Sequence, residues 1–307
     1  MIFPLVSNER IGETVKNFVK TNHFPHAILI EGEAGLGKRT LCSFIAAAAV
    51  CEDGENAPCG QCKGCEMLKA GTHPDVSVTT LQDKKKSITV AQIRQARADA
   101  FIKPQSSPRR VMIIEQAHTL NEQSQNALLK VLEEPPGQTV FILLAENKSA
   151  LLQTVLSRCV TLSLTAPPTE AAFAFLKKQN PKAEDEAIFA ALSAARNNIG
   201  RAGALLKKKS FSKAYTAAEE FLEIYMNGGR KYDLLKITAR MDKDRALANE
   251  FLKELKFAVN SNLQRSANNV VTLLRLVKLN DLITQKSPLL TTNINLALFF
   301  SGFICNL

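Results

Sequence analysis

The chain has 307 residues, enough for two or three domains with at least one sizeable hydrophobic core. Hydrophobic residues make up 46% and charged residues 22% of the chain, values typical of a globular protein that folds in water. No apolar run approaches the roughly 20 residues that span a bilayer, and the first residues lack an export signal. The sequence therefore predicts a cytoplasmic protein with no membrane partner.

A net charge of +10, from 39 Lys and Arg against 29 Asp and Glu, favours polyanionic partners and nucleic acid first. Aromatic residues make up only 6% of the chain and Trp is missing, which argues against a stacking platform for single strands. DNA binding is therefore expected through the phosphate backbone. The lysine runs Lys84–Lys86 and Lys207–Lys209 are candidates, with an ordinary solvated surface as the open alternative.

The first half of the chain alternates helices with apolar strands. Apolar spacing predicts a helix over 9–22, followed by a buried strand at Ala27–Ile30. Further strands are expected at Val76–Thr80, Val111–Ile114, Val140–Leu144 and Val160–Leu164, with helices between them at Leu41–Val50, 89–101, Asn121–Leu132 and Leu151–Leu156. Such alternation is typical of a doubly wound parallel α/β sheet.

The turn from Gly32 to Thr40, between the first strand and the next helix, has the spacing of a P-loop. In such a turn, backbone N–H groups and the start of the helix face a phosphate, and the lysine reaches the outer phosphates. Arg39 stands where the magnesium-binding hydroxyl belongs, and Thr40 follows one residue late, about 100° around the helix. ATP or ADP binding stays open, metal-dependent hydrolysis is disfavoured, and a glycine turn without a ligand is the alternative. The nucleotide-binding candidates in the turn are Gly32, Gly35, Gly37, Lys38, Arg39 and Thr40.

A second departure from the residues that ATP hydrolysis needs follows the predicted strand Val111–Ile114. A nucleotide-hydrolysing site needs one carboxylate to hold magnesium and another to polarise the attacking water. Glu115 can serve the metal and is a further nucleotide-site candidate, but the carboxamide of Gln116 cannot accept a proton. His118 is interpreted as a structural polar residue at a strand end.

Four of the seven cysteines follow the pattern Cys-x7-Cys-x2-Cys-x2-Cys, within residues 51–75. In a cytosolic chain this clustering favours a metal over disulfides. Four thiolates complete a tetrahedral zinc shell and leave no open position, so the predicted zinc site is structural. Four unrelated thiols are the alternative. The candidate ligands are Cys51, Cys59, Cys62 and Cys65.

Beyond Ala166-Pro167-Pro168 the strand pattern disappears. Short helices are expected at 169–178, 183–196 and 200–208, and longer amphipathic helices follow from about Phe211. The predicted organisation is a nucleotide-binding domain over 1–166, with the zinc module at 51–75, an α-helical module over 167–208 and an α-helical domain over 209–307.

Two further motifs resemble those of a known family. The run Asn126–Pro136, which contains Leu-Leu-Lys-Val-Leu-Glu-Glu-Pro-Pro, resembles a hallmark of bacterial sliding-clamp loaders. Ser157-Arg158-Cys159 resembles the Ser-Arg-Cys motif of the same AAA+ subunits. The four-cysteine insertion and the run Gly71–Asp75 also stand in the family's positions, so the resemblance covers residues 1 to about 208.

This resemblance implies an AAA+ domain with a zinc insertion, a helical lid and a collar domain that assembles a multisubunit ring. The implied partners are the other subunits of the DNA polymerase III clamp loader (gamma/tau and delta), the sliding clamp and primer–template DNA. The ring opens the clamp and places it on primed DNA. The helical tail of this chain is compatible with such a collar.

The resemblance also assigns roles to two arginines. Arg158 matches the arginine finger, which neutralises charge on the γ-phosphate in the neighbouring subunit's site; a local salt bridge is the alternative. Arg201 matches the second-sensor arginine of the lid, which reads nucleotide in the chain's own pocket, with a solvated arginine at a helix start as the alternative. The first sensor is expected near Glu146-Asn147.

Three functional hypotheses follow. The leading one is a loader subunit that acts by assembly and by supplying Arg158, while its own ATP hydrolysis is weak or absent. The second is an active loader ATPase of the gamma/tau kind. The third is a zinc-dependent nucleic-acid-binding module with a vestigial P-loop. ATP turnover and DNA affinity of the isolated chain separate the three.

Overall fold

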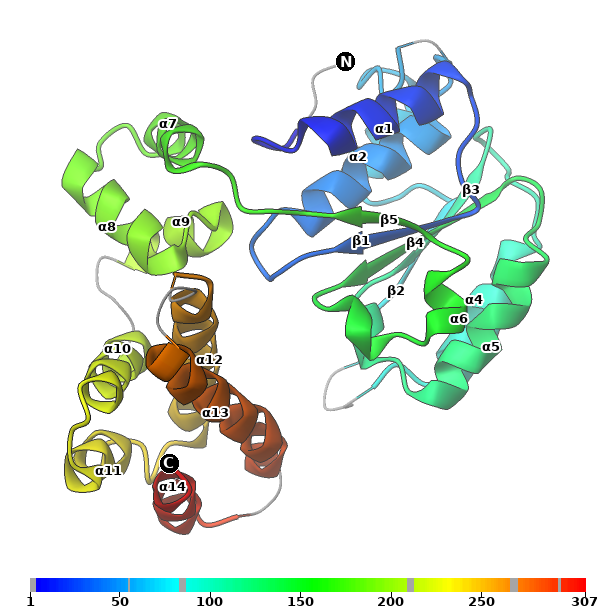
Figure 1. The fold of residues 1–307 in the computed structure, drawn as a ribbon. Coiled ribbons are helices and arrows are strands. Elements are labelled where there is room, and N and C mark those ends of the chain that lie inside the picture. The colour runs from blue at the N-terminus through cyan, green and yellow to red at the C-terminus, as the bar shows by residue number, and fades with distance from the viewer. Residues whose placement is uncertain (1–3, 55, 83–86, 209–212, 266–269, 292–293) are drawn as a thin grey trace. The chain divides into compact units, whose positions relative to one another are not determined.

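The computed structural model describes residues 4–54, 56–82, 87–208, 213–265, 270–291 and 294–307 (Figure 1). The chain divides into two compact units, Met1–Gly203 and Ala204–Leu307. The lysine run 84–86, Lys209 and the start of the predicted collar lie outside the described residues. Among the described residues, every helix is too short or too polar to span a bilayer.

The first unit is built on a five-stranded parallel sheet with strand order β2-β3-β4-β1-β5. The inner strand β1 pairs with the central strand β4 and the edge strand β5, so that Ile28 lies beside Ile142 and Val160. The predicted doubly wound parallel sheet is confirmed. The strands are β1 (Ala27–Glu31), β2 (Val76–Thr79), β3 (Arg110–Ile114), β4 (Thr139–Ala145) and β5 (Val160–Ser163).

Helices cover both faces of this sheet (Figure 1). Because side chains alternate along a strand, Leu29 packs on the face of α4, α5 and α6, while Ile28 and Ile30 pack on the face of α1 and α2. Burial on both faces explains why the inner strands β1, β3 and β4 read as continuous apolar runs, whereas the edge strands β2 and β5 stay partly exposed. The helices are α1 (Glu9–Lys20), α2 (Lys38–Val50), α3 (Lys63–Ala70), α4 (Val90–Ala100), α5 (Glu122–Glu133) and α6 (Gln153–Leu156).

Side-chain caps fix the start of three of these helices, since the Cys62 sulfur accepts a hydrogen bond from the Cys65 backbone N–H at α3. Thr89 and Gln92 form a reciprocal capping box at α4, within the helix predicted over 89–101. Asn121 accepts a hydrogen bond from the Ser124 backbone N–H and caps α5. One helix was not predicted: α3 lies inside the segment 51–75, for which only the four-cysteine module was expected.

Asp75, the last residue of the run Gly71–Asp75, organises the loop that precedes β3. Its carboxylate is fully buried and accepts hydrogen bonds from the backbone N–H groups of Gln105 (2.7 Å) and Ser106 (2.8 Å) and from the Ser107 hydroxyl (2.9 Å). Burial favours the neutral carboxyl, but these hydrogen bonds outweigh it and hold the pKa of Asp75 below its usual value.

Asp75→Asn is therefore expected to lower the free energy of unfolding by about 2 kcal/mol at neutral pH, because buried donors lose a charged acceptor. A carboxyl whose pKa falls on folding stabilises the protein above its unfolded pKa, and the contribution is lost as the pH falls through the folded pKa. The difference between variant and wild type should thus shrink below about pH 4. Urea denaturation at several pH values measures it. Asp99→Asn, on the half-exposed face of α4, is the control, and equal effects of the two variants would contradict the assignment.

Beyond the sheet the chain is helical. The short helices are α7 (Thr169–Gln179), α8 (Asp185–Ala195) and α9 (Ile199–Lys208); the longer part comprises α10 (Lys213–Met226), α11 (Lys231–Ala239), α12 (Arg245–Arg265), α13 (Val270–Lys286) and α14 (Leu296–Cys305). The second unit has its own core, in which Phe221, Phe251 and Phe300 are fully buried and meet edge to face. On α13, Val271 and Leu274 are each 64% exposed, so an apolar face of this helix is not covered by the described residues.

Candidate functional site

The P-loop turn borders a cavity of about 410 Å³ at the carboxyl end of the sheet. Parallel α/β sheets place ligand sites at this end of their strands. Of the predicted nucleotide-site residues, Gly32 and Arg201 do not line the cavity. Those that do line it are Gly35, Gly37, Lys38, Arg39, Thr40 and Glu115, together with Gln116, His118 and Glu146.

Two glycines shape the turn. Gly35 and Gly37 have φ values of 97° and 92°, a left-handed conformation that side chains other than glycine rarely adopt. Gly37 directly precedes α2, which begins at Lys38 rather than at the predicted Leu41. The turn therefore has the backbone that a P-loop requires.

The P-loop lysine is folded back onto its own turn. The Lys38 ammonium group donates hydrogen bonds to the backbone carbonyl oxygens of Gly32 and Glu33, the latter at 2.9 Å. Burial lowers the pKa of Lys38. In this conformation two of the three ammonium donors are used within the turn and are not available to a phosphate.

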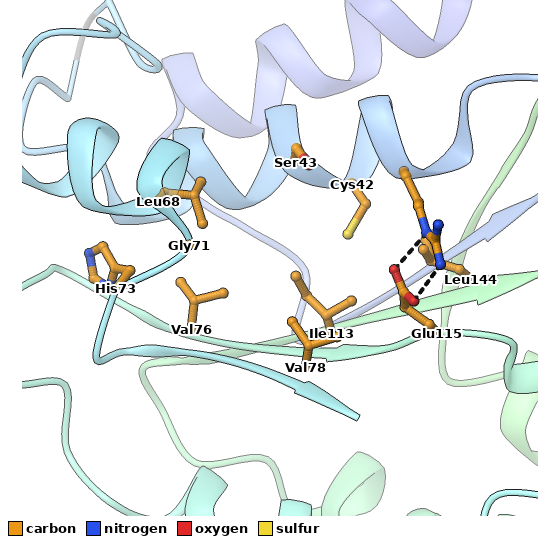
Figure 2. Close-up of a pocket in the computed structure, with 11 residues that line it drawn as sticks. Cys42, Ser43, Leu68, Gly71, His73, Val76, Val78, Ile113, Glu115 and Leu144 are labelled. Carbon is orange, nitrogen blue, oxygen red and sulfur yellow. Dashed lines mark hydrogen bonds and ion pairs between the residues drawn. The ribbon is translucent and has the colours of Figure 1, made fainter. Parts of the chain in front are cut away.

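Arg39 and Glu115 form a bidentate ion pair at the place where a magnesium ion would be held. The Arg39 Nε and Nη2 atoms each lie 2.8 Å from one Glu115 carboxylate oxygen. Figure 2 shows both contacts as dashed lines at Glu115, next to Leu144 and Cys42. In this conformation a guanidinium neutralises the Glu115 carboxylate, so a divalent cation would have to compete with Arg39 for the same oxygens.

Gln116 and His118 complete the polar edge of the cavity. His118 Nδ1 accepts a hydrogen bond from the Glu146 backbone N–H at 3.2 Å, which fixes the neutral imidazole. Burial also lowers the pKa of His118. His118 thus ties the segment after β3 to the segment after β4, and the Glu146 carboxylate faces the same cavity as Lys38.

The helical module contacts the P-loop through the start of α9. The Asn198 side-chain amide donates to the Ala34 carbonyl oxygen at 2.9 Å, and the Gly200 backbone N–H donates to the Gly35 carbonyl oxygen at 3.1 Å. Asn198 Oδ1 accepts from the Arg201 backbone N–H at 3.2 Å. Sequence reasoning singled out Arg201 and missed Asn198, because the helix was predicted to start at residue 200, whereas α9 starts at Ile199, directly after Asn198.

The four clustered cysteines converge. Their sulfur atoms all lie within 4.8 Å of one another, and the Cys51 and Cys62 sulfurs are 3.9 Å apart. Tetrahedral Zn–S bonds of about 2.3 Å place the sulfurs about 3.8 Å apart. Backbone N–H groups of Cys59, Cys62 and Cys65 each donate to a cysteine sulfur of the cluster. The donor set and its spacing could thus bind zinc.

One thiol of this cluster has a lowered pKa, which favours metal binding. Burial favours the neutral Cys62 thiol, but hydrogen bonds from the backbone of Glu52 and Cys65 and from neighbouring thiols lower the pKa of Cys62 to about 7. The thiolate is the metal-binding form of cysteine. Cys62 therefore offers a thiolate near neutral pH.

Arg158 lies away from the P-loop, directly after α6 and before β5. Its Nη1 donates to the Thr154 carbonyl oxygen at 2.9 Å, and its Nη2 lies 3.0 Å from a Glu133 carboxylate oxygen. Both residues border a groove of about 940 Å³ formed with the end of α1 and the start of β1. Sequence reasoning anticipated a local salt bridge only as an alternative role for Arg158 and did not identify Glu133 as its partner.

Comparison with known proteins decides the family. A family model described as DNA polymerase III, delta subunit, matches residues 7–168, which include the P-loop, the four cysteines and Arg158. The chain belongs to the DNA polymerase III delta subunit family. The resemblance to bacterial clamp-loader subunits that the motifs indicated is thereby confirmed.

Individual relatives of the family agree. The DNA polymerase III delta' subunit of Pseudomonas aeruginosa is 40% identical over 164 residues, 53% of this chain and 50% of the relative. The delta' subunit of Haemophilus influenzae is 33% identical over 221 residues, 72% of this chain and 65% of the relative. The chain thus spans about half to two thirds of the length of these curated relatives.

One solved structure supports the fold across both units. A DNA polymerase III gamma subunit-related protein from Thermotoga maritima aligns with a TM-score of 0.50 at 18% identity, over 95% of this chain and 97% of that one. At this identity the likeness establishes a shared fold alone. The predicted order of an α/β nucleotide-binding fold followed by helices agrees with it.

Proposed function

We propose that this chain acts as the delta' subunit of the DNA polymerase III clamp loader, helping to place the sliding clamp on primed DNA. The proposal rests on a difference between two sites of this chain, the groove beside Arg158 and the P-loop cavity. The chain keeps Arg158 at the border of an open groove, while its own P-loop cavity holds the Arg39–Glu115 ion pair. A subunit that serves its neighbour and does not hydrolyse ATP itself would have this distribution of residues.

In this proposal Arg158 acts in trans. A positive guanidinium near the γ-phosphate of a nucleotide held by the next subunit neutralises the charge that develops during phosphoryl transfer. The groove of about 940 Å³ beside Arg158 offers the neighbour room to approach. The P-loop turn follows the carboxyl end of β1, whereas Arg158 precedes the amino end of β5, and this separation supports a trans role over a role in the chain's own pocket.

The chain's own cavity is proposed to be hydrolytically idle for three reasons. Arg39 competes with a metal ion for Glu115, Gln116 cannot serve as a base, and Lys38 is turned toward its own backbone. ATP or ADP can still enter a cavity of about 410 Å³, with Gly35, Gly37 and Thr40 at its border. Gly32 and Arg201 stay proposed as contributors to nucleotide binding, although neither lines the cavity. Magnesium is not required by this proposal.

The four cysteines are proposed to hold a structural zinc ion. The bound ion would connect the end of α2 to the start of α3, since Cys51 follows α2 and Cys62 caps α3. It would supply no chemistry to the nucleotide cavity, because four protein ligands leave no coordination position open.

The proposed partners are the gamma/tau and delta subunits, with the sliding clamp and primer–template DNA met through the assembled loader. The proposed domains are an AAA+ domain over 1–166, a lid over 167–208 and a collar over 209–307. The exposed apolar side chains of α13 support a collar that packs against other subunits. A location in the cytoplasm, with the replicating chromosome, follows from the same proposal.

The test combines a measurement of loader-ring assembly with a measurement of ATP hydrolysis by the isolated chain. The purified chain, mixed with gamma/tau and delta, is expected to form a defined ring by size-exclusion chromatography with light scattering. The isolated chain is expected to hydrolyse no ATP above background, with Lys38→Ala unchanged. Turnover by the isolated chain that Lys38→Ala abolishes would favour the second candidate, an active loader ATPase of the gamma/tau kind, which the P-loop backbone supports.

A further inference from the structure

The last residue of α5 is an acidic residue in an unfavourable place. Glu133 ends the helix Glu122–Glu133, where exposed backbone carbonyl groups give the helix terminus partial negative charge. A carboxylate at this end of a helix is destabilising unless a cation compensates for it. The side chain is 49% exposed, so it is not held there by packing in the core.

Arg158 supplies the compensating charge. The Glu133 carboxylate oxygen lies 3.0 Å from Arg158 Nη2, although 25 residues separate the two positions in the chain. Arg158 Nη1 donates to the Thr154 carbonyl oxygen at 2.9 Å and contacts the Ser157 hydroxyl at 3.4 Å. The guanidinium is therefore held on two sides, by the carboxylate of α5 and by the last turn of α6.

These contacts leave part of the guanidinium unused. An arginine carries five N–H donors in one plane, and the three contacts with described residues occupy at most three of them. The Arg158 side chain remains 35% exposed and borders the groove of about 940 Å³. A phosphate oxygen that enters this groove can thus meet a guanidinium that is already oriented.

We propose that Glu133 is a positioning residue, which orients Arg158 for a nucleotide phosphate of a neighbouring subunit. This inference rests on the proposed function and adds a second residue of this chain to the site. A long arginine side chain loses substantial rotamer entropy when it is fixed in one geometry. The charge-assisted contact with Glu133 fixes the Arg158 guanidinium when the chain folds. The rotamer entropy of Arg158 is therefore lost on folding and not during the reaction.

Inhibition is the opposite role for the contact between Glu133 and Arg158. If Glu133 held Arg158 away from the phosphate, removing the carboxylate charge would speed the reaction. The geometry favours orientation, because the contacts leave donors unused and the guanidinium stays at the border of the groove. The two uses predict changes of opposite sign, so one variant distinguishes them.

The experiment measures ATP turnover by the loader reconstituted with Glu133→Gln. This variant keeps the size of the side chain and removes its charge. The kcat of the site next to Arg158 is expected to fall about tenfold with little change in KM for ATP, because orientation matters in the transition state. Glu134→Gln, at the exposed neighbouring carboxylate, is the matched control and should stay within about twofold of wild type.

Three outcomes are decisive. An unchanged rate in Arg158→Ala would overturn the proposed function itself. A slow Arg158→Ala with a wild-type or faster Glu133→Gln would overturn only the positioning role. In the full chain alone, ¹⁵N relaxation of the Arg158 Nε–H group should show greater mobility in Glu133→Gln and not in Glu134→Gln; equal mobility would also overturn the positioning role.

Discussion

Arg158→Ala is expected to slow ATP hydrolysis at the adjoining site of the reconstituted loader by about 10³-fold, the lower range for an arginine finger. The reason is electrostatic: no other lysine or arginine lines the groove among the described residues, so charge on the phosphate would lose its guanidinium partner. Single-turnover phosphate release resolves this site from the other active sites of the ring. Steady-state turnover falls only by the share that this site contributes.

Measurements of folding and of ring assembly distinguish a loss of catalysis in Arg158→Ala from misfolding or failed assembly. The variant removes a partly exposed ion pair with Glu133, which contributes about 1 kcal/mol or less to stability. The variant chain should therefore fold and enter the ring as the wild type does. Arg10→Ala, on the exposed side of α1, is the control and should leave turnover unchanged. A ring that contains Arg158→Ala and turns over ATP at the wild-type rate would reduce Arg158 to a local salt bridge.

Much of the sheet could be predicted because its signals are local. Strands buried on both faces appear as short apolar runs, such as Val140–Leu144 within β4. The P-loop turn was recognisable from the spacing of Gly32, Gly37 and Lys38, and the left-handed backbone at Gly37 explains why this position needs glycine. Caps such as Thr89 are local as well. Five of the six predicted nucleotide-site residues at the cavity lie in this one turn, whereas Glu115 reaches them through the pairing of β3 with β4.

The remaining features depend on contacts between distant segments. The pairing of Glu133 with Arg158 follows from how α5 and α6 pack together, which no local pattern encodes. The hydrogen bond from Asn198 to Ala34 joins residues that are 164 positions apart. The inward fold of Lys38 is a rotamer choice within a glycine-rich turn. Of these contacts, the inward fold of Lys38 lies at the cavity and withdraws two ammonium donors from a phosphate, so the sequence predicted the residues of the cavity better than their conformation.

Helix α3 was missed for a different reason. It has only eight residues, and its sequence Lys-Gly-Cys-Glu-Met-Leu-Lys-Ala shows too few turns for an apolar period to emerge. Its start is fixed by the Cys62 sulfur, which accepts a hydrogen bond from the Cys65 backbone N–H. A cysteine that serves both as a cap and as a proposed metal ligand is not recognised by ordinary capping rules.

Cys62→Ser is expected to abolish stoichiometric zinc binding. Zinc bound by four thiolates contributes about 10–16 kcal/mol of apparent binding free energy in small modules, and one missing ligand opens the shell. Metal analysis of the purified chain should give one zinc per wild-type chain and much less for the variant. Cys305→Ser is the matched control, because this exposed cysteine lies outside the cluster, and it should keep full zinc content.

The structural damage should stay within the segment 51–75. Cys51 and Cys65 form a small separate cluster with Val19, Ala48 and Ala57, whereas the two faces of the sheet have their own cores. Loss of zinc should therefore expose this segment to limited proteolysis while far-ultraviolet circular dichroism barely changes. Ring assembly and the effect of Arg158 should survive, because the groove beside Arg158 uses none of the four cysteines. Full zinc content in Cys62→Ser would mean that the converging sulfurs are not the metal site.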